Sequence, residues 1–224
     1  MQENHKLNIL AIDTCTEMAS VTLLSSRKSY SKELSGVEKT SGHVLKLCDE
    51  VFKESQTQLK DVDLISYSKG PGSFTGVRMC IGVVQGLSLS MEIPTMGFTT
   101  LELVGFRASQ LLKSKKIAVA LDARMCEVYW ATYVDGSIDN MKICSPEEVG
   151  DLDTSFVGVG SGWKVYSEKL KLVSNVTDID LSIQPESSAL IELSLQAIKA
   201  GLEGAIELPQ PIYLRNNVAE KSLK

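Results

Sequence analysis

Histidine is scarce in this sequence, which contains only His5 and His43. A Ser-His-Asp triad would therefore depend on His43, and no nucleophile-elbow sequence accompanies it. His5 lies near the start of the chain, where fraying is expected. His43 falls in the first turn of an expected helix, where the ordinary interpretation is a surface or interface imidazole. Hydrolytic chemistry is therefore a disfavoured class of function.

The five cysteines lack the pattern of a disulfide framework or a metal site. Their number is odd, they are scattered, and there is no C-x-x-C pair. They are interpreted as reduced thiols that are mostly packed inside the protein. No metal site is predicted.

An excess of basic residues is also missing, since the formal net charge is −5. A protein that binds nucleic acid by itself usually carries a basic excess, so any RNA would have to be held mainly by another subunit. No apolar run approaches the roughly 18 residues of a membrane span. Residues 1–6 lack the apolar core of a signal peptide. A cytoplasmic protein that does not contact a membrane is expected.

One sequence pattern, an apolar run that ends in aspartate, occurs twice. Residues 7–13 form an almost continuous apolar run ending in Asp13, which is typical of a buried strand. Residues 117–122 repeat this pattern and end in Asp122. In both places an alternating segment follows after a short gap, as in a hairpin. We therefore expect two related subdomains, at 1–105 and 106–224.

Other elements follow from periodicity and caps. Ser73 or Thr75 is expected to cap the helix after the glycine-rich loop, and Thr99 or Thr100 the next helix. The remaining expectations are strands at 19–24, 28–34, 62–67 and 127–133, helices at 41–55, 75–91, 100–112 and 187–202, and an extended tail at 209–217.

Asp13 and Asp122 could hold a metal and a nucleotide between the two subdomains. Such a site needs close backbone approach to phosphate, which glycine permits. The turns after both aspartates lack glycine, so both phosphate cradles look closed. Gly158, Gly160 and Gly162 could still accommodate adenine or ribose, although a tight strand-to-helix turn is the favoured interpretation.

The stretch YSKGPGSFTGVR at 67–78 resembles a phosphate-binding loop, but its glycines also suit a turn before a helix. Gly76, Gly82 and Gly86 each cost roughly 1 kcal/mol relative to alanine inside a helix, so a close neighbour should compensate. The helix at 75–91 is apolar nearly all round. This favours a subunit interface about as much as an internal core.

Four segments together resemble the TsaB family, also called YeaZ. They are ILAIDT at 9–14, GPGSFTGVR at 70–78, LDARMCEVYWA at 121–131 and PIYLRNNVA at 211–219, and they span nearly the whole chain. The resemblance implies an α/β, actin-like fold with duplicated βββαβα subdomains, as in Hsp70 and sugar kinases. It also implies an accessory subunit for N6-threonylcarbamoyladenosine formation next to the tRNA anticodon, with threonylcarbamoyl-AMP supplied by a separate synthase.

The partners implied by the resemblance are the catalytic paralogue TsaD and the ATPase TsaE, with tRNA bound only through the complex. The N-terminal helices would contact TsaD, and the isolated chain could form a homodimer through the same surface. No cofactor is expected on this chain alone, whereas ATP or ADP could bind in the assembled complex. The interface residues carried over are His43, Val44, Leu47, Val51, Val77, Arg78, Ile81, Gly82 and Gly86.

TsaD-like catalysis is not expected, because the His-x-x-x-His pair that follows Ile-Pro in TsaD is missing after Ile93-Pro94. Two other functions remain open, an ATP-using enzyme that depends on Asp13 and a glycoprotease that depends on His43. The tail residues Tyr213, Arg215, Asn216 and Asn217 either contact a partner or pack across the mouth between the subdomains.

Overall fold

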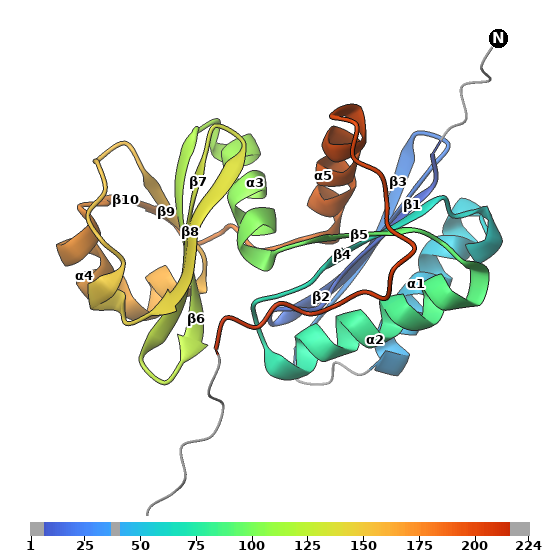
Figure 1. Cartoon of the computed structure of the whole chain (residues 1–224), viewed down its shortest axis with the longest axis horizontal. Helices are drawn as coiled ribbons and strands as arrows, with labels where there is room; N and C mark the ends of the chain where they lie inside the picture. The colour runs from blue at the N-terminus through green and yellow to red at the C-terminus, as the bar shows by residue number, and fades with distance from the viewer. Residues whose placement is uncertain (1–6, 37–40, 216–224) are drawn as a thin grey trace, which may run out of the picture.

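Two five-stranded sheets stand side by side in the computed structural model, which describes residues 7–36 and 41–215 (Figure 1). Each sheet combines three sequential antiparallel strands with two further parallel strands, so the second half of the chain repeats the topology of the first. The expected duplication of βββαβα subdomains in an actin-like fold is confirmed. The expectations for His5, Asn216 and Asn217 lie outside the described residues.

The first sheet has the order β3-β2-β1-β4-β5, with β1 (Ile9–Asp13) at its centre. Every residue of β1 is buried, because both faces of the strand are covered by other elements. This burial explains the uninterrupted apolar run in the sequence. The other strands are β2 (Met18–Ser25), β3 (Lys28–Ser35), β4 (Leu64–Ser68) and β5 (Thr95–Phe98).

The second sheet has the order β10-β9-β6-β7-β8, with β6 (Lys116–Arg124) at its centre. The sequence patterns locate neither β8 (Ser137–Cys144) nor β10 (Asp178–Asp180). Both are edge strands with little burial, so their residues carry no clear apolar alternation. The remaining two strands are β7 (Glu127–Val134) and β9 (Val157–Val159).

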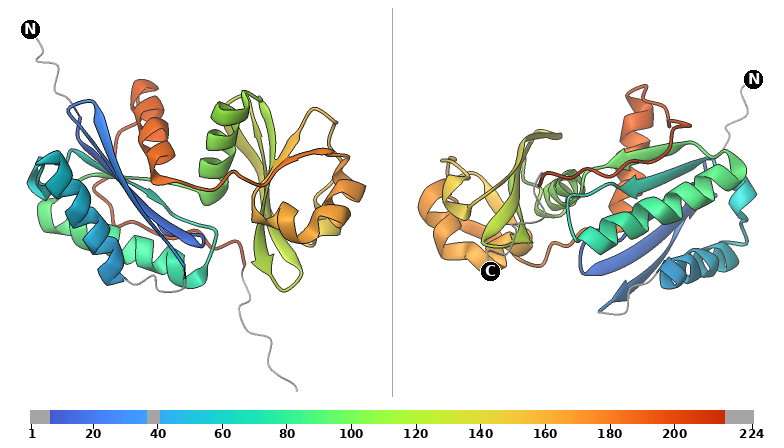
Figure 2. Two further views of the ribbon diagram at one scale, coloured as in Figure 1. Left: turned by 180° about the vertical axis from the view of Figure 1, so that it is seen from behind. Right: turned by 60° about the horizontal axis from the view of Figure 1, so that its bottom comes forward.

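Five helices cover the sheets in the described part of the chain. Figures 1 and 2 show α1 (Ser41–Ser55) and α2 (Phe74–Met91) on the outer face of the first sheet and α4 (Ser161–Ser174) on that of the second. Between the sheets lie α3 (Thr100–Leu112) and α5 (Ser187–Lys199). Two short 3-10 helices complete the order, η1 (Leu59–Asp61) and η2 (Pro146–Glu148).

The two central helices are exchanged between the halves. Helix α3 packs on β6 and β7, whereas α5 packs on β1, β2 and β4, and the two helices contact each other. One hydrophobic cluster therefore joins both sheets, with Ile9 and Leu64 from the first and Ile117 and Tyr133 from the second. The expected division between residues 105 and 106 falls inside α3, whose contacts with strands are to the second sheet.

Helix α5 is fastened to the first sheet by buried hydroxyl groups. Ser187 Oγ lies 2.8 Å from Thr22 Oγ1, and the Ser187 amide donates to Ser20 Oγ at 2.9 Å. Further along, Ser194 Oγ donates to Ser66 Oγ at 2.8 Å. Small side chains allow close packing, and each hydroxyl finds a partner that offsets its desolvation.

The predicted caps are resolved to one residue each. Ser73 Oγ accepts from the amide of Gly76 at the start of α2. Thr99 Oγ1 accepts from the amide of Glu102, and the Glu102 carboxylate accepts from the amide of Thr99. These bonds satisfy amides that have no partner within the helix.

The five cysteines are all free thiols. Cys15, Cys48, Cys80 and Cys144 are buried and only Cys126 is exposed, which confirms thiols that are mostly packed. Burial raises the pKa of Cys48 to about 12. A buried, protonated thiol is a poor nucleophile.

We therefore expect a thiol titration of the native protein with Ellman's reagent to show one rapidly reacting group, Cys126. All five should react after denaturation in guanidinium. The Cys126→Ser variant is the matched control and should lose the rapid phase. A second rapid thiol in the native protein would contradict the packing of the other four.

Candidate functional site

The glycine-rich loop after β4 packs directly on the turn that follows β1. A Cβ at Gly72 would lie under 3.0 Å from Cys15 O, and one at Gly76 would lie as close to Thr14 O. The Ser73 amide donates to Cys15 O at 2.8 Å, and Thr14 Oγ1 donates to Gly76 O at 2.6 Å. The two glycines therefore serve a contact between backbones of the same chain.

Asp13, at the end of β1, is completely buried. Its carboxylate accepts hydrogen bonds from Ser68 Oγ and, at 3.2 Å, from the amide of Cys15. Groups of the surrounding chain thus hold this carboxylate in the interior.

Asp122, the corresponding residue of β6, is held by its own turn and by Tyr166 of α4. Its carboxylate accepts from the Arg124 amide at 2.9 Å and from Tyr166 Oη at 3.4 Å, and it pairs with the Arg124 guanidinium at 3.2 Å. Burial, followed by the negative charge of Asp122, raises the pKa of Tyr166. The arginine supplies the positive charge beside this carboxylate.

The glycines at 158, 160 and 162 also pack closely against their own chain. A Cβ at Gly160 or Gly162 would lie under 3.0 Å from backbone atoms of Ala120, and one at Gly158 would meet the ring of Trp163. These approaches agree with a tight strand-to-helix turn between β9 and α4. They are taken up by residues of the same chain.

The residues at the ends of β1 and β6 therefore do not fit a nucleotide phosphate. The glycine backbones that would have to approach a phosphate lie against the chain itself. Within residues 7–36 and 41–215, no three His, Cys, Asp or Glu side chains gather closely enough to hold a metal ion.

The predicted interface residues divide into two groups. Five are buried in the core between the outer helices and the first sheet, with exposed fractions of 8% or less. The expectation that these side chains contact a partner is corrected, because the apolar periodicity marks the face of each helix that packs on the sheet. The buried residues are Val44, Leu47, Val51, Val77 and Ile81.

The other four predicted residues reach the surface. His43 is half-buried, and Arg78, Gly82 and Gly86 lie exposed along α2. No neighbouring atom lies within 4 Å of where a Cβ of Gly82 or Gly86 would be, so both glycines face open space. The backbone of α2 is therefore exposed at these two positions, and another chain could pack closely against it.

Large apolar side chains are also exposed on α1 and α2, and the sequence patterns overlooked most of them. Phe74 is 49% exposed and Leu89 is 62% exposed. Leu45 of α1 and Met91 at the end of α2 are also exposed. We call these four residues, with Gly82 and Gly86, the outer face. Exposed large apolar side chains on a helix surface are candidates for a protein contact.

Helix α2 also passes a length and composition test for a membrane span, the one helix to do so in the described part of the chain. Its inner face packs on the first sheet, as expected for a core helix of a soluble protein. Membrane insertion therefore receives weak support from this helix.

Beside α2 runs an extended segment, residues 205–215, which we call the C-terminal strap (Figure 1). Gln85 Nε2 donates to Pro209 O at 2.8 Å, and Arg78 Nε donates to Tyr213 Oη at 3.3 Å. Arg215 then pairs with Glu127 of β7. Tyr213 thus packs on the first subdomain and Arg215 on the second, so the described tail packs across both; its other expected role, contact with a partner, stays a prediction.

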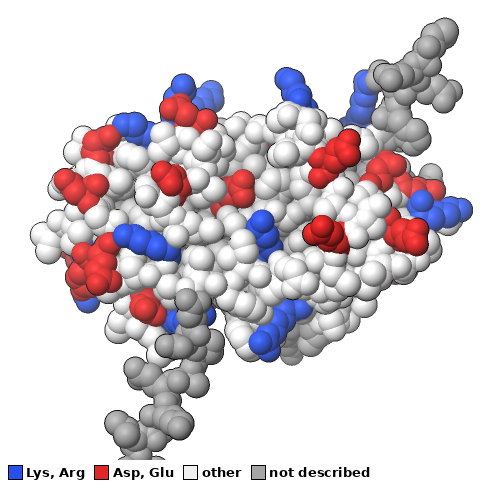
Figure 3. Space-filling view, in the orientation of Figure 1, with Lys and Arg blue, Asp and Glu red and all other residues white. Residues whose placement is uncertain are grey.

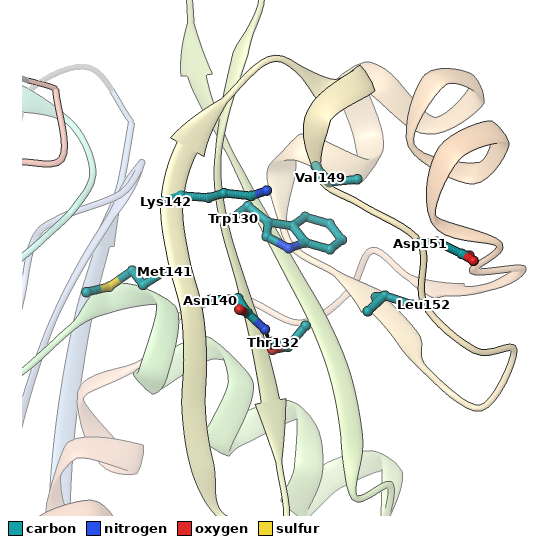
Figure 4. A pocket seen from close by; sticks show the side chains of 8 residues that line it. All are labelled: Trp130, Thr132, Asn140, Met141, Lys142, Val149, Asp151 and Leu152. Atoms are coloured by element: carbon teal, nitrogen blue, oxygen red, sulfur yellow. Dashed lines mark hydrogen bonds between the residues drawn. The ribbon is translucent and has the colours of Figure 1, made fainter.

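A hollow of about 330 Å³ lies on the second sheet, away from these features (Figure 4). Trp130 and Lys142 line it from β7 and β8, and Val149 and Leu152 from the following loop. The Lys142 ammonium group is engaged by Glu148 O at 2.7 Å. None of the predicted site residues lines this hollow.

Charges of both signs are interspersed on the face shown in Figure 3. No continuous basic stripe of the kind that tracks a nucleic acid backbone occurs there. This agrees with the negative net charge of the sequence.

Comparison with known proteins finds relatives that match nearly the whole chain. The family model described as TsaD, tRNA N6-adenosine threonylcarbamoyltransferase, matches residues 24–223. The tRNA threonylcarbamoyladenosine biosynthesis protein TsaB of Escherichia coli is 35% identical, with 97% of this chain and 98% of the relative covered. The TsaB protein of Haemophilus influenzae is 33% identical, with 97% of each chain covered.

Solved structures agree with the sequence relatives. YeaZ from Pseudomonas aeruginosa has a TM-score of 0.83 and 32% identity, with 93% of this chain and 100% of that chain covered. A second Pseudomonas aeruginosa structure, described as similar to peptidase YEAZ, has a TM-score of 0.85 and 32% identity over the same shares.

Proposed function

The chain belongs to the TsaB (YeaZ) family, and on this premise we propose that it is a non-catalytic subunit that binds and stabilises TsaD. Its role lies in the biosynthesis of threonylcarbamoyladenosine in tRNA, as the names of its relatives indicate. TsaE joins the same assembly, and tRNA is reached only through the complex.

The observation that carries this proposal is the outer face. Phe74 and Leu89 leave apolar surface open to solvent, and Gly82 and Gly86 remove the side chains that would keep another backbone away. Interfaces that pack closely tend to combine such small residues with exposed aromatic and apolar anchors. The isolated chain would use the same face to form a homodimer.

We propose that the chain is not catalytic because of the contacts made at the ends of β1 and β6. Gly72 and Gly76 lie against the backbone of Thr14 and Cys15, and Arg124 neutralises Asp122. A nucleotide would have to displace these contacts before it could bind to this chain alone. ATP or ADP is therefore assigned to the assembled complex.

The proposal is tested by reconstitution with TsaD, TsaE, threonylcarbamoyl-AMP, ATP and tRNA. Modified adenosine, measured by mass spectrometry of digested tRNA, should form with this chain and fall to background when it is omitted. The chain alone should form none. Equal modification without the chain would contradict its role as a required subunit.

Two side reactions are measured in the same preparation. ATP hydrolysis by the isolated chain that disappears in Asp13→Asn would instead support an ATP-using enzyme. Proteolysis of casein or TsaD that disappears in His43→Ala would support a peptidase.

A further inference from the structure

We propose that the C-terminal strap is a latch that ties α2 to the hairpin between β6 and β7, and so fixes the two subdomains relative to each other. The inference concerns the isolated chain and does not depend on the identity of its partner. It follows from where the strap is anchored at each end and from how exposed the nearby ion pair between Arg124 and Glu17 is.

The strap is anchored first on the edge of the first sheet. Thr95 and Ala205 exchange two backbone hydrogen bonds, at 2.8 and 2.9 Å. Further along, the Ile212 amide donates to Lys69 O at 2.7 Å. Gly70 lies so close that a Cβ there would be 2.9 Å from Ile212 O. The path of the strap is therefore fixed by backbone contacts as far as Ile212.

The next anchor is a small cluster at the start of α2. The Arg78 guanidinium lies 3.7 Å above the centre of the Phe74 ring, and Arg78 Nε donates to Tyr213 Oη at 3.3 Å. The Phe74 and Tyr213 rings are 6.3 Å apart between centroids. Cation–π and ring contacts of this type hold Tyr213 against the helix.

The strap then crosses to the second subdomain through Arg215. This guanidinium donates to Ala123 O at 3.1 Å, lies 3.4 Å from Met125 Sδ and forms an ion pair with Glu127. The Arg215 side chain is only 21% exposed. A partly desolvated arginine with several acceptors binds more firmly than an exposed ion pair.

A second ion pair joins this hairpin to the turn before β2 and is weak by comparison, whereas Arg107 and Glu186 pair between α3 and the start of α5, beside the shared core. Arg124 and Glu17 are 4.0 Å apart, with side chains 78% and 97% exposed. Pairs of this kind contribute little to stability. Because α3 and α5 join the halves through a shared apolar core, loss of Arg215 would let the second subdomain rotate about that core as about a hinge.

The hairpin itself gives a reason for needing support. Its tip holds Arg124, Met125 and Cys126 at φ values of 63°, 54° and 60°, a left-handed conformation that these residues rarely adopt. Arg215 contacts Met125 Sδ and Ala123 O within this tip. The latch therefore acts on the least relaxed part of the second sheet.

The test measures the separation of the subdomains with spin labels on Ser29→Cys and Leu172→Cys, both at exposed positions, in a Cys126→Ser background. Labelled chain is diluted into an excess of unlabelled chain, so that distances within one molecule are read. We expect Arg215→Gln and Glu127→Gln to broaden the distance distribution and move it to longer values. Lys116→Gln, which removes the Lys116–Asp153 pair inside the second subdomain, is the matched control and should leave it unchanged.

Hydrogen exchange supplies a second readout that does not need labels. Amides 123–128 should exchange about tenfold faster in Arg215→Gln than in the original chain, while amides in α5 should be unaffected. Distance distributions and exchange rates that match those of the original chain would overturn the latch. A general increase of exchange in both sheets would also overturn it, because it would indicate global destabilisation.

Discussion

Gly76→Ala is expected to lower the free energy of unfolding by about 3 kcal/mol, although the same change inside an exposed helix normally raises it. A Cβ at Gly76 would lie under 3.0 Å from Thr14 O. The obstacle is a backbone carbonyl, so no rotation of a side chain can relieve the overlap. Either α2 or the turn after β1 has to move, and Thr14 Oγ1 would lose its bond to Gly76 O.

The measurement is thermal and urea unfolding of the purified variant, with a fall in the melting temperature of roughly 6 to 12 °C expected for a chain of this size. Gly82→Ala is the matched control on the same helix. No atom lies within 4 Å of its new Cβ, so it should stabilise the isolated chain by about 0.5 to 1 kcal/mol. Equal effects of the two variants would refute the assigned contact between α2 and the turn after β1.

These opposite signs illustrate what the sequence can and cannot predict. The cost of glycine in a helix predicts a compensating neighbour for Gly76 and for Gly82, and the structure shows one for Gly76. The cost does not identify that neighbour, because the partner of Gly76 is Thr14, which is 62 residues away along the chain. No atom of the described chain lies within 4 Å of a Cβ at Gly82, so the neighbour proposed for it is a partner protein.

The strands and helices of the core are predictable for a related reason. Buried elements such as β1 repeat apolar residues with a regular period, which is a local property of the sequence. The same signal misleads at the candidate interface. On α1 and α2 the periodic residues, such as Val44 and Val77, face the sheet, whereas Leu45 and Phe74 form the outer face without any repeat of their own.

The strap shows a third limit. Prolines predict an extended tail at 209–217, and the structure agrees for the described residues 209–215. The pairing of Arg215 with Glu127 joins residues 88 positions apart, and no local sequence pattern in either segment predicts it. Long-range polar contacts of single residues have to be seen in three dimensions.

The second prediction with a large expected effect concerns the outer face. Gly82→Leu should weaken binding to TsaD at least about 100-fold, equivalent to about 2.7 kcal/mol, as measured by titration calorimetry. The leucine would project into the open space beside α2, where the partner backbone is proposed to approach. Exposed anchors such as Phe74 could then no longer reach their contacts.

This variant is a sharper test of the interface than a charge at Val77, which is only 1% exposed and would disrupt the core. Gly82→Leu should keep its melting temperature when the chain is monomeric, because a Cβ at this position meets no atom of its own molecule and Gly82 is exposed. Lys164→Leu, which adds a leucine to the exposed side of α4, should bind TsaD normally and controls for added hydrophobicity. If folded Gly82→Leu binds TsaD as tightly as the original chain, the outer face is not the binding surface. Reconstituted tRNA modification would then still report separately on whether the chain is required, since that result does not depend on which surface is used.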